Sequence, residues 1–273
     1  MEEIVYLCLF AFLAGFIDSV VGGGGLIQVP ALFIFLPGVP LPTVFGTGKL
    51  ASIAGTTSAM VRYVRSVKIN YLAILPAAVA AFICSFLGAR ALSHFDPALA
   101  RPLILVLLVL VAVYTFIKKD FGSLHAPKLT DAKEKLYGLV VGAAIGFYDG
   151  FFGPGTGSFL IFIFIGIFGF NFLAASAAAK VVNVATNLSA LLYFAYKGFI
   201  LYEVAIPMAI CSIIGSQFGT RMALKRGVGF VRVLFLVVVT GIIIKFAYDT
   251  YGSGGNDFKK LSSAVQEWVR LKG

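Results

Sequence analysis

The sequence has few residues of the kinds that build metal, redox and hydrolytic sites. It contains three cysteines and two histidines in 273 residues. Cys8, Cys84 and Cys211 lie singly in apolar runs, without Cys-x-x-Cys spacing, which favours apolar packing over a metal site. The phosphate-binding loop, HExxH and Gly-x-Ser-x-Gly patterns are also absent. The sequence therefore predicts no cofactor and no metal, and it argues against an ATP-driven pump.

Charge is scarce as well. Charged residues make up 12% of the chain, against about 25% in a soluble domain. Hydrophobic residues reach 60% and the mean hydropathy is +0.98, which predicts a polytopic membrane protein surrounded by the lipid bilayer. The net charge of +10 lies mostly between apolar runs, so it indicates orientation in the membrane rather than nucleic-acid binding. The first apolar run lacks a basic start and a cleavage site, so we do not interpret it as a signal peptide.

Four consecutive glycines interrupt this apolar sequence: Gly22, Gly23, Gly24 and Gly25. Such a run cannot continue a helix at low cost. A backbone break in apolar surroundings needs cover from protein or from a water-filled cavity. Membrane transporters place substrate and ion sites at such breaks, so we expect a site here.

The break occurs twice, because a gap-free shift of 131 residues relates the two halves of the chain. The shift pairs Asp18 with Asp149, Gly22 with Gly153, Gly24 with Gly155, Lys49 with Lys180, Pro76 with Pro207 and Arg90 with Arg221. We expect a first membrane repeat at 1–118, a cytoplasmic linker at 119–135, and a second membrane repeat at 136–249. A tail at 250–273 follows, as an interfacial helix or a solvated end.

Each half contains five apolar elements, which predicts an all-α fold. We expect helices at 4–21, 26–36, 43–64, 70–93 and 98–118, then at 136–152, 157–169, 173–196, 201–224 and 229–248. A full span needs about 20 residues. The second element of each half is too short and the first is marginal, so we expect both to be short or partly re-entrant.

Basic residues in the junctions predict the topology. Three junctions carry most of them: Arg62, Arg65 and Lys68; Lys118, Lys119, Lys128, Lys133 and Lys135; and Arg221, Lys225, Arg226 and Arg232. The junctions between these carry only Arg90, Arg101 and Lys197. With the rich junctions cytoplasmic, the two halves have inverted topology. The basic tail resists this scheme, because ten crossings place both termini outside.

Ionisable residues inside apolar spans are candidates for function. Asp18 and Asp149 each precede a break by four residues. They are either proton or cation relays, or acceptors for the amides that the break frees. Lys49 and Lys180 are either contacts for an anion or side chains that snorkel to the interface.

A polar stripe follows each lysine at helical spacing. Asn183 and Asn187 share a helix face with Lys180, and Ser52 and Thr56 hold the equivalent positions after Lys49. The stripe lines a pathway or forms hydrogen bonds between helices. The helices that follow the breaks have free N–H groups and positive dipole ends, which favour an anion between them. Candidate side-chain contacts there are Gln28, Thr156 and Ser158, beside Gly153 and Gly155.

At these residues the sequence resembles the TauE/SafE family of membrane transporters. The resemblance covers roughly 10–248. It rests on Asp18 with the glycine run through Pro30, on Gly46-Thr47-Gly48-Lys49-Leu50, and on Lys180-Val181-Val182-Asn183 through Thr186-Asn187. It implies secondary export of sulfite, sulfoacetate or another organosulfonate, driven by an ion gradient. The second half departs from the first at Pro154 and Thr156, which replace glycines, so the two halves of the site are not expected to be equivalent.

The leading hypothesis is therefore a transporter, not an enzyme, in the cytoplasmic membrane. A small anion would bind at the glycine breaks and the two polar stripes, and Asp18 or Asp149 would carry the coupling H⁺ (Na⁺ is the other candidate ion). Inverted halves would rock about the site. The alternatives are an intramembrane aspartyl protease using Asp18 and Asp149, and an anion channel. The sequence leaves a homodimer open.

Overall fold

The computed structural model describes residues 2–67, 71–95, 106, 129–226, 240 and 244. The described part is all helical and contains no strand. Its helices are α1 (Glu2–Val21), α2 (Gly25–Phe35), α3 (Leu41–Ser66), α4 (Tyr71–Ser93), α6 (Asp131–Phe151), α7 (Thr156–Gly166), α8 (Phe172–Tyr196) and α9 (Tyr202–Arg226). The elements expected at 98–118 and 229–248, and the tail at 250–273, lie outside the described residues.

The helix after each break is short, as predicted. Both α2 and α7 have 11 residues, about half of what a membrane span needs. The prediction that the helix before each break is also short was wrong, because α1 has 20 residues and α6 has 21. Helix α6 begins at Asp131, inside the expected linker. Asp131 and Glu134 lie in its first turn, where acidic side chains favour a helix start.

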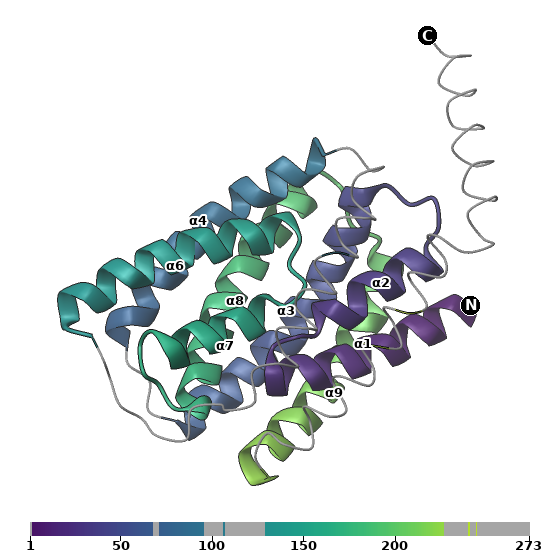
Figure 1. The fold of residues 1–273 in the computed structure, drawn as a ribbon. Helices are drawn as coiled ribbons and strands as arrows, with labels where there is room; N and C mark the ends of the chain where they lie inside the picture. The colour runs from purple at the N-terminus through teal and green to yellow at the C-terminus, as the bar shows by residue number, and fades with distance from the viewer. Residues whose placement is uncertain are drawn as a thin grey trace.

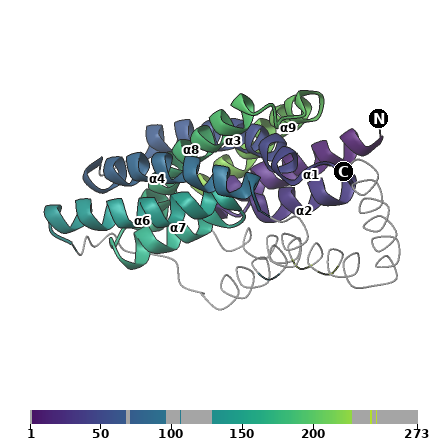
Figure 2. The same ribbon diagram turned by 90° about the horizontal axis from the view of Figure 1, so that it is seen from above.

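The helices form two bundles, and neither bundle is one half of the sequence. Helices α1, α2, α3 and α9 pack together as the first bundle, and α4, α6, α7 and α8 form the second bundle. Figures 1 and 2 show α1 beside α9 and α4 beside α6. Each bundle therefore combines three helices of one half with one helix of the other. Contacts between the bundles are made mainly by α3 and α8.

Glycine lets the paired helices approach closely. An added Cβ at Gly15 of α1 would lie 2.3 Å from the Ser212 carbonyl oxygen of α9. The 131-residue shift carries this contact to Gly146 of α6, where an added Cβ would lie 2.5 Å from the Ala81 Cα of α4. Small residues at such contacts are typical of helices that associate in membranes. The sequence repeat thus recurs in the contacts, while the inverted orientation in the bilayer stays a prediction.

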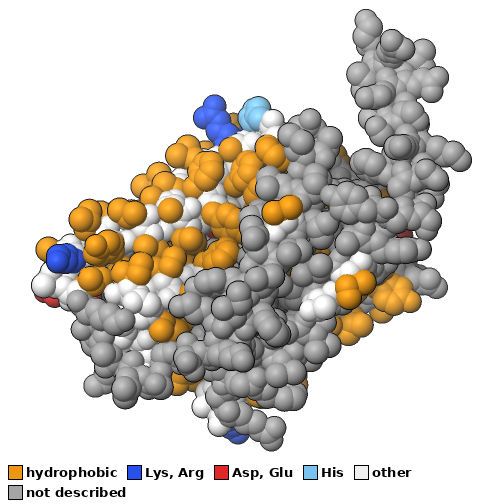
Figure 3. All heavy atoms as spheres, in the orientation of Figure 1, with side chains coloured by type: hydrophobic (Ala, Val, Ile, Leu, Met, Phe, Trp, Pro, Cys, Tyr) orange, Lys and Arg blue, Asp and Glu red, His pale blue; other side chains and the backbone are white. Residues whose placement is uncertain are grey.

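The outer faces of the bundles are apolar. Large exposed side chains follow α4, α6 and α9, and Figure 3 shows them gathered over α4 and α6. Three described segments are long and apolar enough to cross a membrane, namely Glu3–Val21, Ile74–Ser93 and Phe172–Tyr196. Soluble proteins rarely expose apolar patches of this extent. The fold is that of an integral membrane protein.

Candidate site between the glycine breaks

Each break begins with a glycine in the left-handed region. Gly22 has a φ of +80° and ends α1, and the equivalent Gly153 has a φ of +86° and follows α6. The Gly22 N–H donates to the Asp18 carbonyl oxygen, and the Gly153 N–H donates to the Tyr148 carbonyl oxygen. A glycine with positive φ is a common helix stop because other residues are strained there. The local sequence therefore fixes where both helices end.

The two breaks lie directly against each other. An added Cβ at Gly22 would lie 2.3 Å from the carbonyl carbon of Gly157. Ser158 donates its backbone N–H to the Gly22 carbonyl oxygen (3.1 Å) and its hydroxyl to the Val21 carbonyl oxygen (2.6 Å). Thr156 donates its hydroxyl to the Gly153 carbonyl oxygen at 2.8 Å. These groups at the start of α7 therefore bind the protein itself rather than facing an open cavity.

A cavity lies beside the breaks, at the contact between the bundles. Its volume is about 40 Å³, measured as the space open to the centre of a water molecule. By that measure one water needs about 10–15 Å³, so a small anion or a few waters fit. The wall combines charged, amide and hydroxyl side chains with glycine and aromatic residues; its polar members are Asp18, Gln28, Lys49, Ser52, Thr56, Asp149, Asn183, Asn187 and Ser212.

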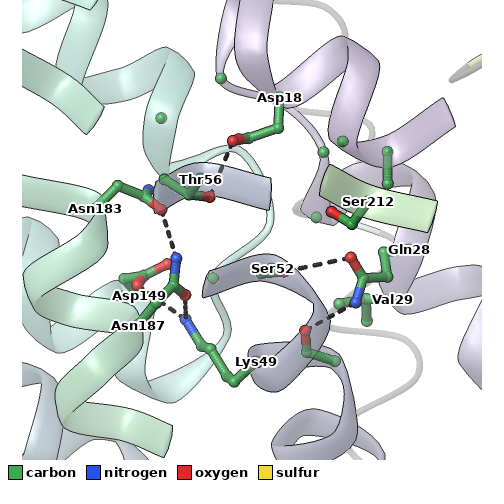
Figure 4. A pocket seen from close by; sticks show the side chains of 18 of the residues that line it. Asp18, Gln28, Val29, Lys49, Ser52, Thr56, Asp149, Asn183, Asn187 and Ser212 are labelled. Carbon is green, nitrogen blue, oxygen red and sulfur yellow. Dashed lines mark hydrogen bonds and ion pairs between the residues drawn. The ribbon is translucent and has the colours of Figure 1, made fainter. Parts of the chain in front are cut away.

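Lys49 of α3 is the cation that the described residues place on the cavity wall. Its Nζ donates to Asp149 Oδ2 of α6 at 2.8 Å and to Asn187 Oδ1 of α8 at 3.0 Å. Asn187 Nδ2 in turn donates to Asn183 Oδ1 at 2.7 Å (Figure 4). The lysine thus crosses from the first bundle to the second, where an ion pair and an amide chain hold it.

Lys180 of α8 forms the equivalent pair in the opposite direction. Its Nζ donates to Asp18 Oδ2 of α1 at 2.8 Å and to the Asp18 carbonyl oxygen. Asp18 Oδ2 also accepts from the Thr56 hydroxyl at 3.1 Å. The Lys180 side chain is fully buried and does not line the cavity. The two lysines are therefore alike in their partners and different in their access to the cavity.

Gln28 connects the short helix α2 to the polar stripe of α3. Its Nε2 donates to the Gly48 carbonyl oxygen at 2.8 Å, and its Oε1 accepts from the Ser52 hydroxyl at 3.3 Å. Figure 4 shows Gln28 joined to Ser52 by this hydrogen bond, with Ser52 on the same helix as Lys49. Gln28 and Ser52 both line the cavity, where the hydroxyl offers one donor and the amide two.

Most of the residues singled out from the sequence lie together. The cavity wall includes twelve of them: Asp18, Gly22, Gly24, Gly25, Gln28, Lys49, Ser52, Thr56, Asp149, Gly153, Asn183 and Asn187. Five others do not line it: Gly23, Gly155, Thr156, Ser158 and Lys180. All three members of the α3 stripe line the cavity, whereas the α8 stripe is divided, because Asn183 and Asn187 line it and Lys180 does not.

Eight wall residues were not among the predicted site residues: Ala14, Gly15, Val29, Phe45, Gly48, Phe152, Gly157 and Ser212. Ser212 of α9 lines the cavity, as do Phe45 of α3 and Phe152 after α6. The rings of Phe45 and Phe152 meet edge to face with centroids 6.2 Å apart. Ser212 lies one helical turn before Ser216, and this pair of hydroxyls was the available signal. The phenylalanines gave none, because aromatic residues occur throughout the chain.

The geometry gives no support to the aspartyl protease alternative. A catalytic dyad needs two carboxyl groups that share a proton. Here Asp18 and Asp149 each pair with a different lysine. Within the described residues, no group of three His, Cys, Asp or Glu side chains is placed to hold a metal ion.

Comparisons with known proteins find membrane transporters. The chain matches the family described as "Sulfite exporter TauE/SafE" over residues 7–246. It is 34% identical to a "Probable membrane transporter protein" of Haemophilus influenzae, covering 91% of this chain and 96% of that protein. It is 33% identical to "Probable membrane transporter protein ORF9" of a Sinorhizobium species, covering 90% and 93%. Identity to "Probable membrane transporter protein YfcA" of Escherichia coli K12 is 32%, covering 90% of each. No solved structure matches the chain.

Proposed function

Because this chain belongs to the TauE/SafE sulfite exporter family of membrane transporters, we propose that it exports a small sulfur-containing anion across the cytoplasmic membrane. The candidate substrates are sulfite, sulfoacetate and other organosulfonates. Secondary transport by alternating access would carry them, coupled to H⁺ or Na⁺. A cavity of about 40 Å³ favours the smaller members of this class.

One observation carries the proposal: a buried lysine faces a small cavity among amide and hydroxyl donors. Lys49 is 6% exposed and lines the wall with Asn187 and Ser52. An ammonium group supplies charge, and amide and hydroxyl groups supply directed hydrogen bonds to oxyanion oxygens. Ionisable residues inside membrane spans are costly and are therefore candidates for function.

Lys180 has the same role in the alternate conformation under this proposal. It holds the position equivalent to Lys49, and its partner Asp18 is equivalent to Asp149. In the conformation described here, Lys180 is enclosed while Lys49 faces the cavity. An exchange of these environments would present the anion site from each half in turn.

Ligand-induced thermal stabilisation of the purified protein in detergent tests the proposal. The ligands are sulfite, sulfate, thiosulfate, methanesulfonate, sulfoacetate, taurine, acetate and chloride. A ligand that binds only the folded protein must raise the melting temperature. We expect a small sulfonate or sulfite to stabilise the wild type, and Lys49→Ala to lose this shift. Lys225→Ala, at an exposed lysine of α9, is the matched control and should keep it.

Two results would overturn the proposal at different levels. If no anion shifts the melting temperature, the anion site is wrong. If a sulfonate binds but its flux in proteoliposomes never runs against its own gradient, under either a proton or a sodium gradient, the protein is an anion channel.

A further inference from the structure

The candidate site is electrically neutral as it stands. Lys49, Asp18 and Asp149 line the cavity, and Lys180 contacts Asp18 from behind the wall. Among the described residues, the wall includes no other Lys, Arg, Asp or Glu. An entering anion therefore meets two positive and two negative charges, all of them already paired. A buried charge without a partner is strongly unfavourable, so the anion needs one of these pairs to open.

The Lys49–Asp149 pair is the one that can open into the cavity. Both of its members line the wall, while Lys180 is fully buried behind Asp18. Asp18 also accepts a hydrogen bond from Thr56, so it is held twice. Lys49 is the one side chain in the described part of the chain that donates to the Asp149 carboxylate. Asp149 therefore depends on a single partner that the anion also requires.

Lys49 is the group that neutralises the Asp149 carboxylate, because the other described groups around it do not. Lys180 of α8 and Asp18 of α1 pair with each other, at 2.8 Å. Helix α7 has no titratable side chain, and Arg90 of α4 is exposed. On α6 itself, the neighbouring Tyr148 donates its hydroxyl to the Pro154 carbonyl oxygen at 2.6 Å. No further charge in the described region compensates Asp149 once Lys49 turns to an anion.

We propose that the anion binds together with one proton, which is taken up by Asp149. This inference rests on the proposed anion transport and names its coupling. The proton forms an O–H bond on the Asp149 carboxylate and ends the ion pair, and the anion then takes the place of the carboxylate on the Lys49 ammonium group. The net charge of the site stays zero for a monovalent anion. Charged Asp149 and the anion compete for the same lysine, so anion and proton travel in the same direction.

This coupling decides what drives the flux. A complex of one proton and one monovalent anion is neutral, so the membrane voltage does not act on it. An inward proton gradient draws the anion inward. Export then requires an outward gradient of the anion that exceeds the opposing proton gradient.

Binding of methanesulfonate, which stays ionised between pH 5 and pH 9, tests the proposal. In a range where free Asp149 is charged, uptake of one proton per anion tightens Kd about tenfold for each unit that the pH falls. Calorimetry in two buffers of different ionisation enthalpy should report one proton taken up per anion bound. This measurement needs only the wild type, so it decides the question even if a variant fails to fold.

Asp149→Asn carries the neutral side chain at all pH values. We expect it to bind methanesulfonate with a pH-independent Kd, close to the low-pH value of the wild type. Asp131→Asn, at an exposed carboxylate in the first turn of the same helix, is the matched control and should keep the wild-type slope. A wild-type Kd that does not change with pH would overturn the proton coupling and leave anion transport standing. Absence of binding at every pH would overturn both.

Flux gives an independent readout of direction. Proteoliposomes loaded with methanesulfonate should acidify an unbuffered outer medium as the anion leaves. Alkalinisation during efflux would mean exchange of the anion for a proton, and it would overturn co-transport in one direction. Efflux with no change in pH would also overturn it.

Discussion

Gly22 is a residue whose backbone no other amino acid reproduces without strain. Its φ of +80° is in the left-handed region, and an added Cβ would lie 2.3 Å from the carbonyl carbon of Gly157. The Ser158 N–H also binds the Gly22 carbonyl oxygen. One glycine therefore ends α1, accepts a hydrogen bond from the first turn of α7 and permits contact between the two breaks.

A substitution at Gly22 should lower the free energy of unfolding by more than the backbone strain of a positive φ alone. We expect Gly22→Ala to lower the stability of the fold by more than Gly38→Ala does. Gly38 has a similar φ of +85°, but an added Cβ there meets nothing within 4 Å. The Gly38 variant therefore measures the left-handed strain, about 1–2 kcal/mol, and the excess at Gly22 measures the overlap with Gly157. Thermal unfolding of both variants in detergent checks this, and equal losses would contradict it.

At the residue scale, the sequence predicted much of the cavity but not its pairings. The helical spacing of Lys49, Ser52 and Thr56 placed them on one face, because that geometry is local to α3. The partner of Lys49 is not local. It is Asp149 from the other half of the chain, and nothing in the repeat distinguishes this choice from Asp18. The pairing follows from how the bundles meet, which depends on packing over the whole contact.

Helix pairs are the next scale, and glycine contacts determine how closely they approach. An added Cβ at Gly88 of α4 would lie 2.2 Å from the Phe147 carbonyl oxygen of α6. An added Cβ at the equivalent Gly219 of α9 would lie 2.4 Å from the Phe16 carbonyl oxygen of α1. Both contacts are with backbone, which cannot move aside as a side chain does. These positions therefore set the spacing of α4 from α6 and of α9 from α1.

Larger side chains at these positions should separate the helices. We expect Gly88→Val and Gly219→Val to destabilise the protein by similar amounts, each about 1–3 kcal/mol or more, because they make equivalent contacts. Gly166→Val, near the end of α7 where an added Cβ meets open space, is the control for the change of residue type. Melting temperatures in detergent measure the effect. If one of the two variants lowers the melting temperature strongly and the other does not, the two positions related by the repeat do not contribute equally to stability.

Element boundaries were predicted well where composition changes sharply. The glycine runs located the starts of α2 and α7, because four glycines or a Gly-Pro-Gly segment stop a helix wherever they occur. The start of α6 was misplaced, since charged Lys133 and Lys135 were interpreted as linker. In the structure they lie in the first turns of the helix. A helix that extends past the apolar region carries charges at its end at little cost, so charge alone does not mark the boundary.

At the scale of the whole molecule, the basic junctions predict opposite orientations of the two halves in the bilayer. Ser66 ends α3, and Lys197 follows α8 at the equivalent position. Both side chains are exposed. The charge pattern puts the first junction in the cytoplasm and the second outside.

Cysteine labelling tests this orientation directly. In a background with Cys8, Cys84 and Cys211 replaced by alanine, we expect Lys197→Cys to react with a membrane-impermeant maleimide added to intact spheroplasts. Ser66→Cys should react only after the membrane is permeabilised. If both positions react from the same side, the halves are parallel and the inverted topology is wrong.

The exchange of helices between bundles has a consequence for how the protein is made. The first bundle is α1, α2 and α3 closed by α9, which is synthesised more than one hundred residues later. Until α9 enters the membrane, the groove shaped by Gly15 and Gly55 for Ser212 has no occupant. During synthesis, the first half of the chain therefore lies in the membrane as an incomplete bundle until α9 is inserted. Two separately expressed halves should accumulate only when the cell makes both.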